Sequence, residues 1–177
     1  MNHPYIVGWG HTPFGKLDSV ELEQLVRDAV LPALETAGLE PAAIGGIFVG
    51  HFNGGFVPQD FSASLVSMAI PAFRHTPAVR LENACATGSA AIWAALDAVG
   101  SGRIKRALVI GMEKMNTVSG PQIGEILLKC SYVKEESKTP GGFAGVFGNI
   151  AQSYFDQFGD QSDALAAIAA KNHENGA

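Results

Sequence analysis

The sequence predicts an α/β protein in which a mostly parallel sheet is layered with helices. Four short apolar runs predict buried strands: residues 5–10, 44–49, 77–81 and 107–111. Segments with helical patterns separate these runs, so a helix is expected between each strand and the next. This alternation favours parallel strands joined by helical crossovers.

The first predicted helix spans residues 18–36. Its start resembles a capping box, because Asp18 precedes Glu21 by three residues, and Gly38 is a suitable C-cap. Its apolar residues recur at helical spacing and make one stripe: Leu22, Leu25, Val26, Ala29, Val30, Ala33 and Leu34. A second helix is predicted over residues 60–70.

The segment over residues 80–102 is the one around which the chain is organised. After the turn at 82–84 it contains mainly Ala, Ile, Trp and Leu, with a single charge at Asp97. Such a composition has strong helix propensity and almost no polar face. The sequence therefore predicts a helix buried on every side. One four-stranded layer with few helices gives too little cover for it, so covering structure is expected beyond this layer.

Cys85 lies at the start of this buried helix and is its only reactive side chain. Free backbone N–H groups and the helix dipole favour an anion at that end, so the thiol can be held as a nucleophilic thiolate. An isolated Cys in an Ala-rich helix is more often a small buried hydrophobe. The small neighbours favour the nucleophile, since they leave room for a bulky substrate at the sulfur: Ala84, Ala86, Thr87, Gly88 and Ser89.

The remainder of the chain differs in character. Residues 116–142 mix polar residues, Gly and Pro, and are expected to lie over a site rather than within the sheet. The glycine-rich run over 141–148 lacks the Lys-Ser/Thr of a phosphate-binding loop, so a closely packed loop is predicted instead. Two helices are predicted over 150–158 and 163–173, the second after a capping cluster at 160–162.

Composition excludes several classes of function. The 177 residues carry a formal net charge of −5 without a basic patch, which argues against nucleic-acid binding. No apolar run approaches the length of a membrane span. Without a signal peptide, Cys85 and Cys130 are expected as free thiols in a reducing compartment, the cytoplasm, with a peroxisomal or mitochondrial location left open.

The histidines have no spacing suited to a metal site, so no metal is expected. Each is predicted to be solvated or locally hydrogen-bonded, and none can be placed beside Cys85 by sequence reasoning. They are His3, His11, His51, His75 and His173. The glycines at 8, 10 and 15 do not make a dinucleotide fingerprint, because the spacing is wrong and Pro13 interrupts it.

Several motifs carry a resemblance to a known family. The stretch ENACATGSAAI around Cys85 resembles the nucleophile motif of the thiolase superfamily, and LVIGMEKM resembles the strand and loop that follow it. YIVGWGHTPFGK, VFGNIAQSYFDQFG and AAIAAKNHENGA are similar to stretches of thiolases of the sterol-carrier-protein type. The similarity is collinear over essentially the whole chain, which makes it more specific than any single motif.

The resemblance implies a fold and a domain organisation. Thiolases have two similar α/β halves, and the first half carries an inserted loop domain. Residues 1–116 are similar to the core domain of the first half, and residues 117–177 to part of the loop domain. The chain ends before the second half, which in the family carries the catalytic His, the acid/base Cys and many coenzyme A contacts. No coenzyme A-binding residue is therefore assigned here.

The resemblance also implies the chemistry. Cys85 would attack the carbonyl of an acyl-coenzyme A or 3-ketoacyl-coenzyme A and form an acyl-enzyme, as in an acetyl-CoA acetyltransferase. Coenzyme A thioesters would be substrates, and no permanently bound cofactor is expected. A dimer or tetramer, or a partner chain that supplies the missing half, is implied. The isolated fragment is expected to be inactive.

Two alternatives remain open at this stage. One is a non-catalytic, thiolase-like subunit or lipid-carrier scaffold that pairs with another chain; the intact motif around Cys85 speaks against lost chemistry. The other is a ketosynthase-like condensing enzyme. A carrier-protein substrate would call for a basic docking patch, and the sequence has none.

Overall fold

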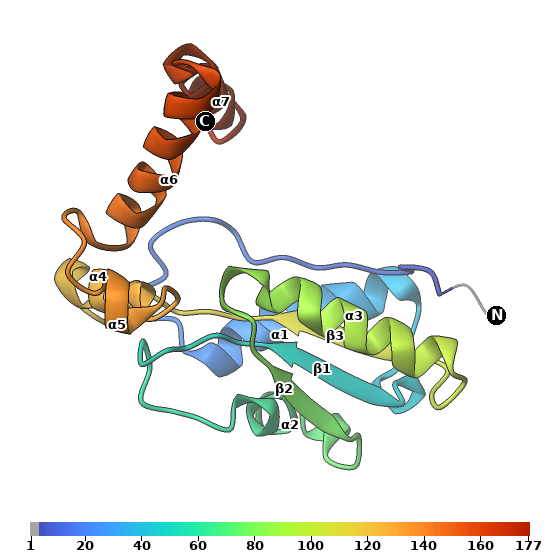
Figure 1. Cartoon of the computed structure of the whole chain (residues 1–177). Coiled ribbons are helices and arrows are strands. Elements are labelled where there is room, and N and C mark those ends of the chain that lie inside the picture. The colour runs from blue at the N-terminus through green and yellow to red at the C-terminus, as the bar shows by residue number, and fades with distance from the viewer. Residues whose placement is uncertain (1–3) are drawn as a thin grey trace. The chain divides into compact units, whose positions relative to one another are not determined.

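The computed structural model describes residues 4–177 and divides the chain into two compact units. The first extends to Ile123 and contains a sheet; the second, Gly124–Ala177, is helical (Figure 1). The predicted α/β class with a parallel sheet is confirmed for the first unit. The predicted domain boundary at residue 116, and the identity of the second part as a loop domain, stay predictions.

The sheet has three parallel strands in the order β2-β1-β3. The central strand, β1 (Gly46–Gly50), is buried along its whole length between β2 (Ala78–Leu81) and β3 (Ala107–Gly111). A strand flanked on both sides and covered on both faces needs the continuous apolar run that the sequence has here. These three strands fall within two residues of their predicted positions.

The predicted first strand over residues 5–10 is wrong. These residues form no strand and lie extended, with the side chains of Tyr5, Ile6, Val7 and Trp9 exposed. The glycines explain the arrangement. A Cβ at Gly8 would lie 2.3 Å from the Ala33 carbonyl oxygen, and one at Gly10 would lie 2.1 Å from that of Ala29. The segment therefore runs against the backbone of the first helix instead of pairing with a strand.

Two helices cover one face of the sheet: α1 (Leu22–Ala37) and α2 (Leu65–Ala69), the latter preceded by a 3₁₀ turn. The buried stripe of α1 is the predicted one at Leu22, Val26, Val30 and Leu34, and it joins one core with residues of α2, β1 and β3. Gly38 takes the left-handed C-cap conformation as predicted, at φ 63°.

The predicted capping box at the start of α1 is wrong. The helix begins at Leu22, and its N-cap Glu21 makes no side-chain capping bond. The Asp18 carboxylate instead accepts a hydrogen bond from Asn116 at 2.7 Å. The ammonium of Lys114, itself buried, donates to the carbonyl of Leu17 at 2.9 Å. The segment before α1 is thus tied to the loop after β3.

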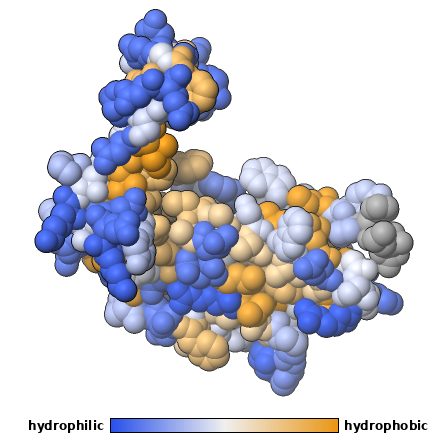
Figure 2. Space-filling model, viewed as in Figure 1, coloured by the Kyte–Doolittle hydropathy of each residue, from blue (hydrophilic) through white to orange (hydrophobic). Residues whose placement is uncertain are grey.

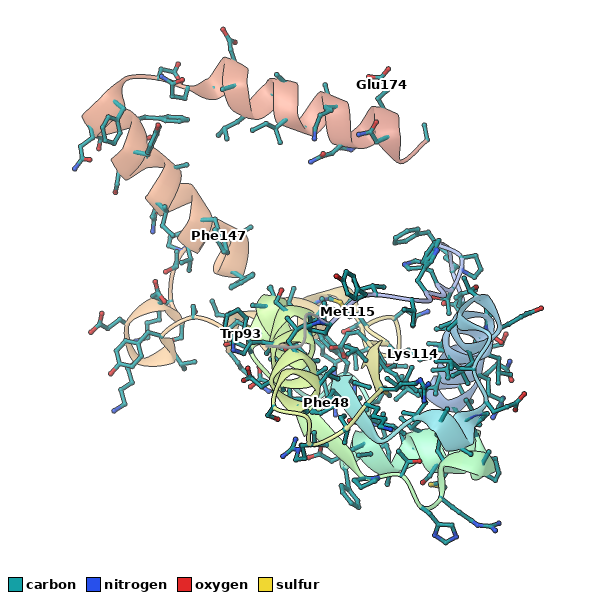
Figure 3. The ribbon with its side chains drawn as sticks, turned by 90° about the vertical axis from the view of Figure 1, so that its right-hand side faces the viewer. Phe48, Trp93, Lys114, Met115, Phe147 and Glu174 are labelled. Carbon is teal, nitrogen blue, oxygen red and sulfur yellow. The ribbon has the colours of Figure 1, made fainter. Side chains whose placement is uncertain are left out.

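The other face of the sheet is covered by α3 (Thr87–Gly100). Ala91, Ala95 and Ala98 pack with Phe48 of β1 in a second core cluster. The prediction that this helix is buried on every side is wrong for the described chain, because Ile92, Trp93 and Leu96 are 47%, 70% and 41% exposed. Figure 3 labels Phe48 and Trp93, and Figure 2 shows apolar colouring over the surface formed by this region. A single helix lying on a sheet buries only one of its faces.

The second unit contains α5 (Val133–Glu136), α6 (Gly142–Phe158) and α7 (Ser162–Asn175), while α4 (Gly120–Leu128) crosses the boundary between the units. The glycine-rich run predicted as a loop is instead mostly the first turns of α6. Gly141 caps α6 in a left-handed conformation, and the rings of Phe143 and Phe147 meet edge to face, four residues apart. Helical spacing of the aromatic residues outweighs the glycines.

None of the helices within residues 4–177 combines the length and the hydropathy that a membrane crossing requires.

Candidate active site

The carboxyl ends of the three strands lie side by side, since Gly50 of β1 is in register with Leu81 of β2 and with Gly111 of β3. In parallel α/β sheets this edge is where ligands bind. The chain leaving it carries several reactive or ionisable groups, among them His51 after β1, Cys85 after β2 and Glu113 after β3. We therefore take this edge as the candidate site.

Cys85 lies in a short 3₁₀ turn, Ala84–Ala86, between β2 and α3. Two side chains fix the entry to this turn. Glu82 accepts a hydrogen bond from the backbone N–H of Ala84 at 2.5 Å, and Thr87 accepts one from that of Asn83 at 2.8 Å. These two side chains, one before and one after Cys85 in the sequence, thereby hold the start of the turn.

The backbone of Ala84 is strained. Its φ of 47° lies in the left-handed region, which costs an L-residue about 1–2 kcal/mol. Strain of this kind persists only where surrounding contacts determine the conformation, and it occurs often at functional sites. The strained residue directly precedes Cys85, whose side chain is exposed. The sulfur is therefore accessible, as the sequence predicts from the small neighbouring residues.

Close packing of β1 against α3 fixes the turn from the other side. A Cβ at Gly50 would lie 3.1 Å from both the carbonyl oxygen and Cγ2 of Thr87. Only glycine allows this approach without a shift of one of the two elements. The last residue of the central strand thus lies against the first residue of α3, two positions after Cys85.

Sequence reasoning missed the burial of His51, which it expects to be solvated or locally hydrogen-bonded. The side chain is fully buried, and Nε2 lies 3.4 Å from Oε1 of Glu113. The predictions for His11, His75 and His173 agree with their exposure, and His3 lies outside the described residues. The signal for His51 is its position directly after a strand that is buried at every residue.

Glu113 and Arg80 hold the loop that follows β1. The Glu113 carboxylate accepts hydrogen bonds from the backbone N–H groups of Phe52 at 3.1 Å and Asn53 at 3.2 Å. Arg80 donates from Nε to the carbonyl of His51 at 2.8 Å and from Nη2 to that of Phe52 at 2.7 Å. Its guanidinium also pairs with Asp60.

Within residues 4–177 no group of three His, Cys, Asp or Glu residues has the arrangement of a metal site. Two small cavities of about 180 and 120 Å³ are present, and Cys85 lines neither. Both are smaller than the range of about 300–1,000 Å³ that is usual for small-molecule pockets. The structure thus places an accessible thiol on a fixed turn, outside both of these cavities.

The fold and this edge define a class: an α/β protein with a cysteine on a tight turn between a parallel strand and a helix. A comparison with family models is more specific. Residues 4–177 match the model for the thiolase N-terminal domain, so the chain belongs to the thiolase family, represented here by that domain. The predicted family is confirmed.

Individual relatives agree with this assignment. Acetyl-CoA acetyltransferases from Methanothermobacter thermautotrophicus and Methanocaldococcus jannaschii are 29% and 31% identical over 176 residues, covering 99% of this chain in both cases. Sterol carrier protein 2 from Bos taurus is 26% identical over 185 residues, covering 98% of this chain and 33% of its own length.

A solved structure, that of an acetyl-CoA acetyltransferase from Syntrophomonas wolfei, is similar with a TM-score of 0.51 and 23% identity. The match covers 59% of this chain and 27% of that one, and it supports the fold alone. This chain spans 45% and 44% of the two acetyltransferases, which is about half their length.

Proposed function

We propose that this chain supplies the nucleophile of a thiolase-type acyltransferase, with Cys85 as the residue that becomes acylated. The observation that carries the proposal is the exposed Cys85 on a strained turn at the carboxyl edge of the sheet, in a chain of the thiolase family. Relatives named acetyl-CoA acetyltransferases, matched along nearly the whole chain, support the reaction class.

In the proposed acylation step the Cys85 thiol gives up its proton, and Sγ forms a bond to the C3 carbonyl carbon of a 3-ketoacyl-coenzyme A. The bond between C3 and C2 breaks, and the acetyl-coenzyme A carbanion that leaves takes up a proton. The acyl group then passes from Sγ to a second thiol, or to the carbanion of an acetyl thioester. The carbonyl oxygen, negatively charged in between, needs hydrogen-bond donors.

The residues of this chain can serve part of that step. They fix the turn that carries the sulfur and leave the sulfur open to a bulky thioester. The backbone N–H of Cys85 is one candidate donor for the oxyanion. We infer that the base, further oxyanion donors and most of the coenzyme A-binding surface come from a second half or a partner chain, so the isolated chain does not turn over substrate. A homo-oligomer, a cytoplasmic location and the lack of a permanent cofactor belong to the same proposal.

The test is peptide mass spectrometry after incubation with acetoacetyl-coenzyme A. Cys130 is an internal control, because it is the other cysteine of the chain and forms no disulfide with Cys85. We expect an acetyl group on Cys85 and none on Cys130, without sustained release of acetyl-coenzyme A. If only Cys130 is acetylated, or if the Cys85→Ala chain gains as much acetyl group as the wild-type chain, Cys85 is not the nucleophile. If neither cysteine is acetylated while iodoacetamide still labels Cys85, the activating groups lie outside this chain.

A second candidate is a thiolase-like subunit without chemistry of its own that pairs with another chain. The exposed apolar face of α3 favours a partner. The same experiment separates the two candidates once the remaining half is supplied. Acetylation of Cys85 in the completed protein supports the enzyme, and its absence there supports the non-catalytic subunit.

A further inference from the structure

His51 is a buried ionisable side chain for which the acylation step has no use. It has 0% exposure, and no residue in the described part of the chain makes a hydrogen bond of good geometry to Nδ1 or Nε2. A buried polar group without a hydrogen-bond partner destabilises the fold. Such a group calls for a specific explanation. The nearest ionised group is the Glu113 carboxylate, 3.4 Å from Nε2.

The backbone of His51 connects directly to the Cys85 turn. Its N–H donates to the carbonyl of Leu81 at 3.2 Å, and Leu81 is the last residue before the segment that leads into the turn. The preceding residue, Gly50, lies against Thr87 at the start of α3. A shift of His51 would therefore reach the turn from both of its ends.

The surroundings of Glu113 determine which form of the imidazole fits. Two donors already approach its carboxylate, the backbone N–H groups of Phe52 and Asn53. An ionised carboxylate accepts hydrogen bonds and donates none. The His51 nitrogen that faces it must therefore carry a proton, which assigns the Nε2–H tautomer to the neutral ring. Arg80 is the other charged group that reaches His51. It donates a hydrogen bond to the backbone carbonyl of His51 and not to the imidazole ring.

We propose that His51 and Glu113 act as a positioning pair that joins the carboxyl ends of β1 and β3 and thereby fixes the turn that carries Cys85. This inference rests on the proposed function, because it assigns the pair a role in the reactivity of the nucleophile. Neither residue touches substrate. Glu113 orients His51, and His51 holds the backbone next to Leu81 and Thr87 in place.

The first test needs no substitution. Long-range ¹H–¹⁵N spectra of the wild-type chain report the tautomer of each histidine. We expect the His51 ring as a fixed Nε2–H tautomer. A His51 ring protonated at Nδ1 alone, or averaging between its two tautomers, would overturn the proposal.

The second test measures the rate at which iodoacetamide alkylates Cys85, followed by peptide mass spectrometry. Circular dichroism first verifies that each variant is folded. His51→Gln and Glu113→Gln should each slow alkylation by about threefold or more, and the double variant should be no slower than the slower single one. In Glu113→Gln one carboxylate oxygen becomes an amide NH2 group, which cannot accept a hydrogen bond from the Nε2–H of His51, although the shape is kept. His75→Gln makes the same change before β2, at the opposite edge of the sheet, and should leave the rate unchanged.

Unchanged rates in folded His51→Gln, or multiplicative effects in the double variant, would contradict the pair. Failure of the proposed function gives a different result. In that case acetoacetyl-coenzyme A would leave Cys85 unmodified even when the missing half is supplied, while the tautomer and the coupled alkylation rates would still be observed.

Discussion

Ala84 shows most directly how single residues shape the candidate site. Its φ of 47° is unfavourable for alanine, and the bonds made by Glu82 and Thr87 hold the backbone there. The strained residue is the direct neighbour of Cys85. We therefore take the turn, rather than the whole helix, as the feature that presents the sulfur.

Substitution of Ala84 by glycine tests this strain. Because glycine adopts positive φ without a steric penalty, Ala84→Gly should raise the free energy of unfolding by up to about 1 kcal/mol. Ala86→Gly is the matched control, since Ala86 has a φ of −93° and gains nothing from glycine. It should lower the free energy by about 0.5–1 kcal/mol. Urea unfolding measures both, and changes of the same sign would show that Ala84 is not strained.

At this scale the exposure of Cys85 follows from its small neighbours, because those properties are local, while its role as the nucleophile stays a prediction. It does not predict the burial of His51. That burial depends on Leu81, Thr87 and Glu113, which come from three segments that are brought together only by the sheet. A loop residue after a fully buried strand is a better candidate for burial than its polarity suggests.

At the scale of elements, the close contact between β1 and α3 depends on a glycine, Gly50, at the end of β1. Gly50 and Gly111 are register partners at the ends of neighbouring strands, yet only Gly50 has atoms where a Cβ would stand. Gly50→Ala should lower the free energy of unfolding by about 1–3 kcal/mol, because Thr87 has to move. Gly111→Ala should change it by less than about 0.5 kcal/mol. Equal losses in thermal or urea unfolding would refute the proposed close approach.

The start of α7 gives a prediction about pH. The Asp160 carboxylate accepts hydrogen bonds from the hydroxyl and the backbone N–H of Ser162, and these bonds lower its pKa from the usual 3.8. The ionised form thus stabilises the helix start. The stabilisation is complete well above pH 3.8, and it is lost as the pH falls through the lowered pKa. NMR titration should show Asp160 titrating below 3.8, and its pKa should rise toward 3.8 in Ser162→Ala. A value at or above 3.8 would contradict the capping role.

The pattern of apolar residues predicts the apolar stripe of α1 correctly, and three of the four strands predicted from it are present in the structure. In these segments the spacing of the apolar residues matches the residues that are buried. The pattern fails for residues 5–10, where the same apolar alternation lies against α1 through Gly8 and Gly10. It also fails for the glycine-rich start of α6, where aromatic residues at helical spacing prevail. Which strands pair and which elements pack together are tertiary properties, so they cannot be predicted from the local sequence pattern.

At the scale of the whole molecule, the two faces of the sheet differ. One face is covered by α1 and α2 over a large core, whereas α3 alone lies on the other and leaves Ile92, Trp93 and Leu96 exposed. The sequence predicts enclosure of α3, and the structure of this chain does not provide it. The chain also spans only about half the length of its acetyltransferase relatives. Both facts fit a protein whose second half covers α3.

The fluorescence of Trp93 can show whether additional protein structure covers the exposed face of α3. In a form of the protein extended to the length of its relatives, we expect the emission of Trp93 to shift to the blue and its quenching by acrylamide to fall, compared with this chain. A Trp9→Phe background leaves Trp93 as the single tryptophan. Trp93→Ser should change the stability of this chain by less than about 0.5 kcal/mol, since the side chain is largely exposed.

The same substitution should destabilise the extended form by about 3 kcal/mol or more, because it would then remove a large buried aromatic side chain. Ala95→Ser is the matched control on the buried side of α3, and it should destabilise both forms to a similar extent. If Trp93 is quenched equally in both forms and Trp93→Ser is neutral in both, the second half does not cover this helix. The exposed face of α3 would then belong to a contact with a separate chain.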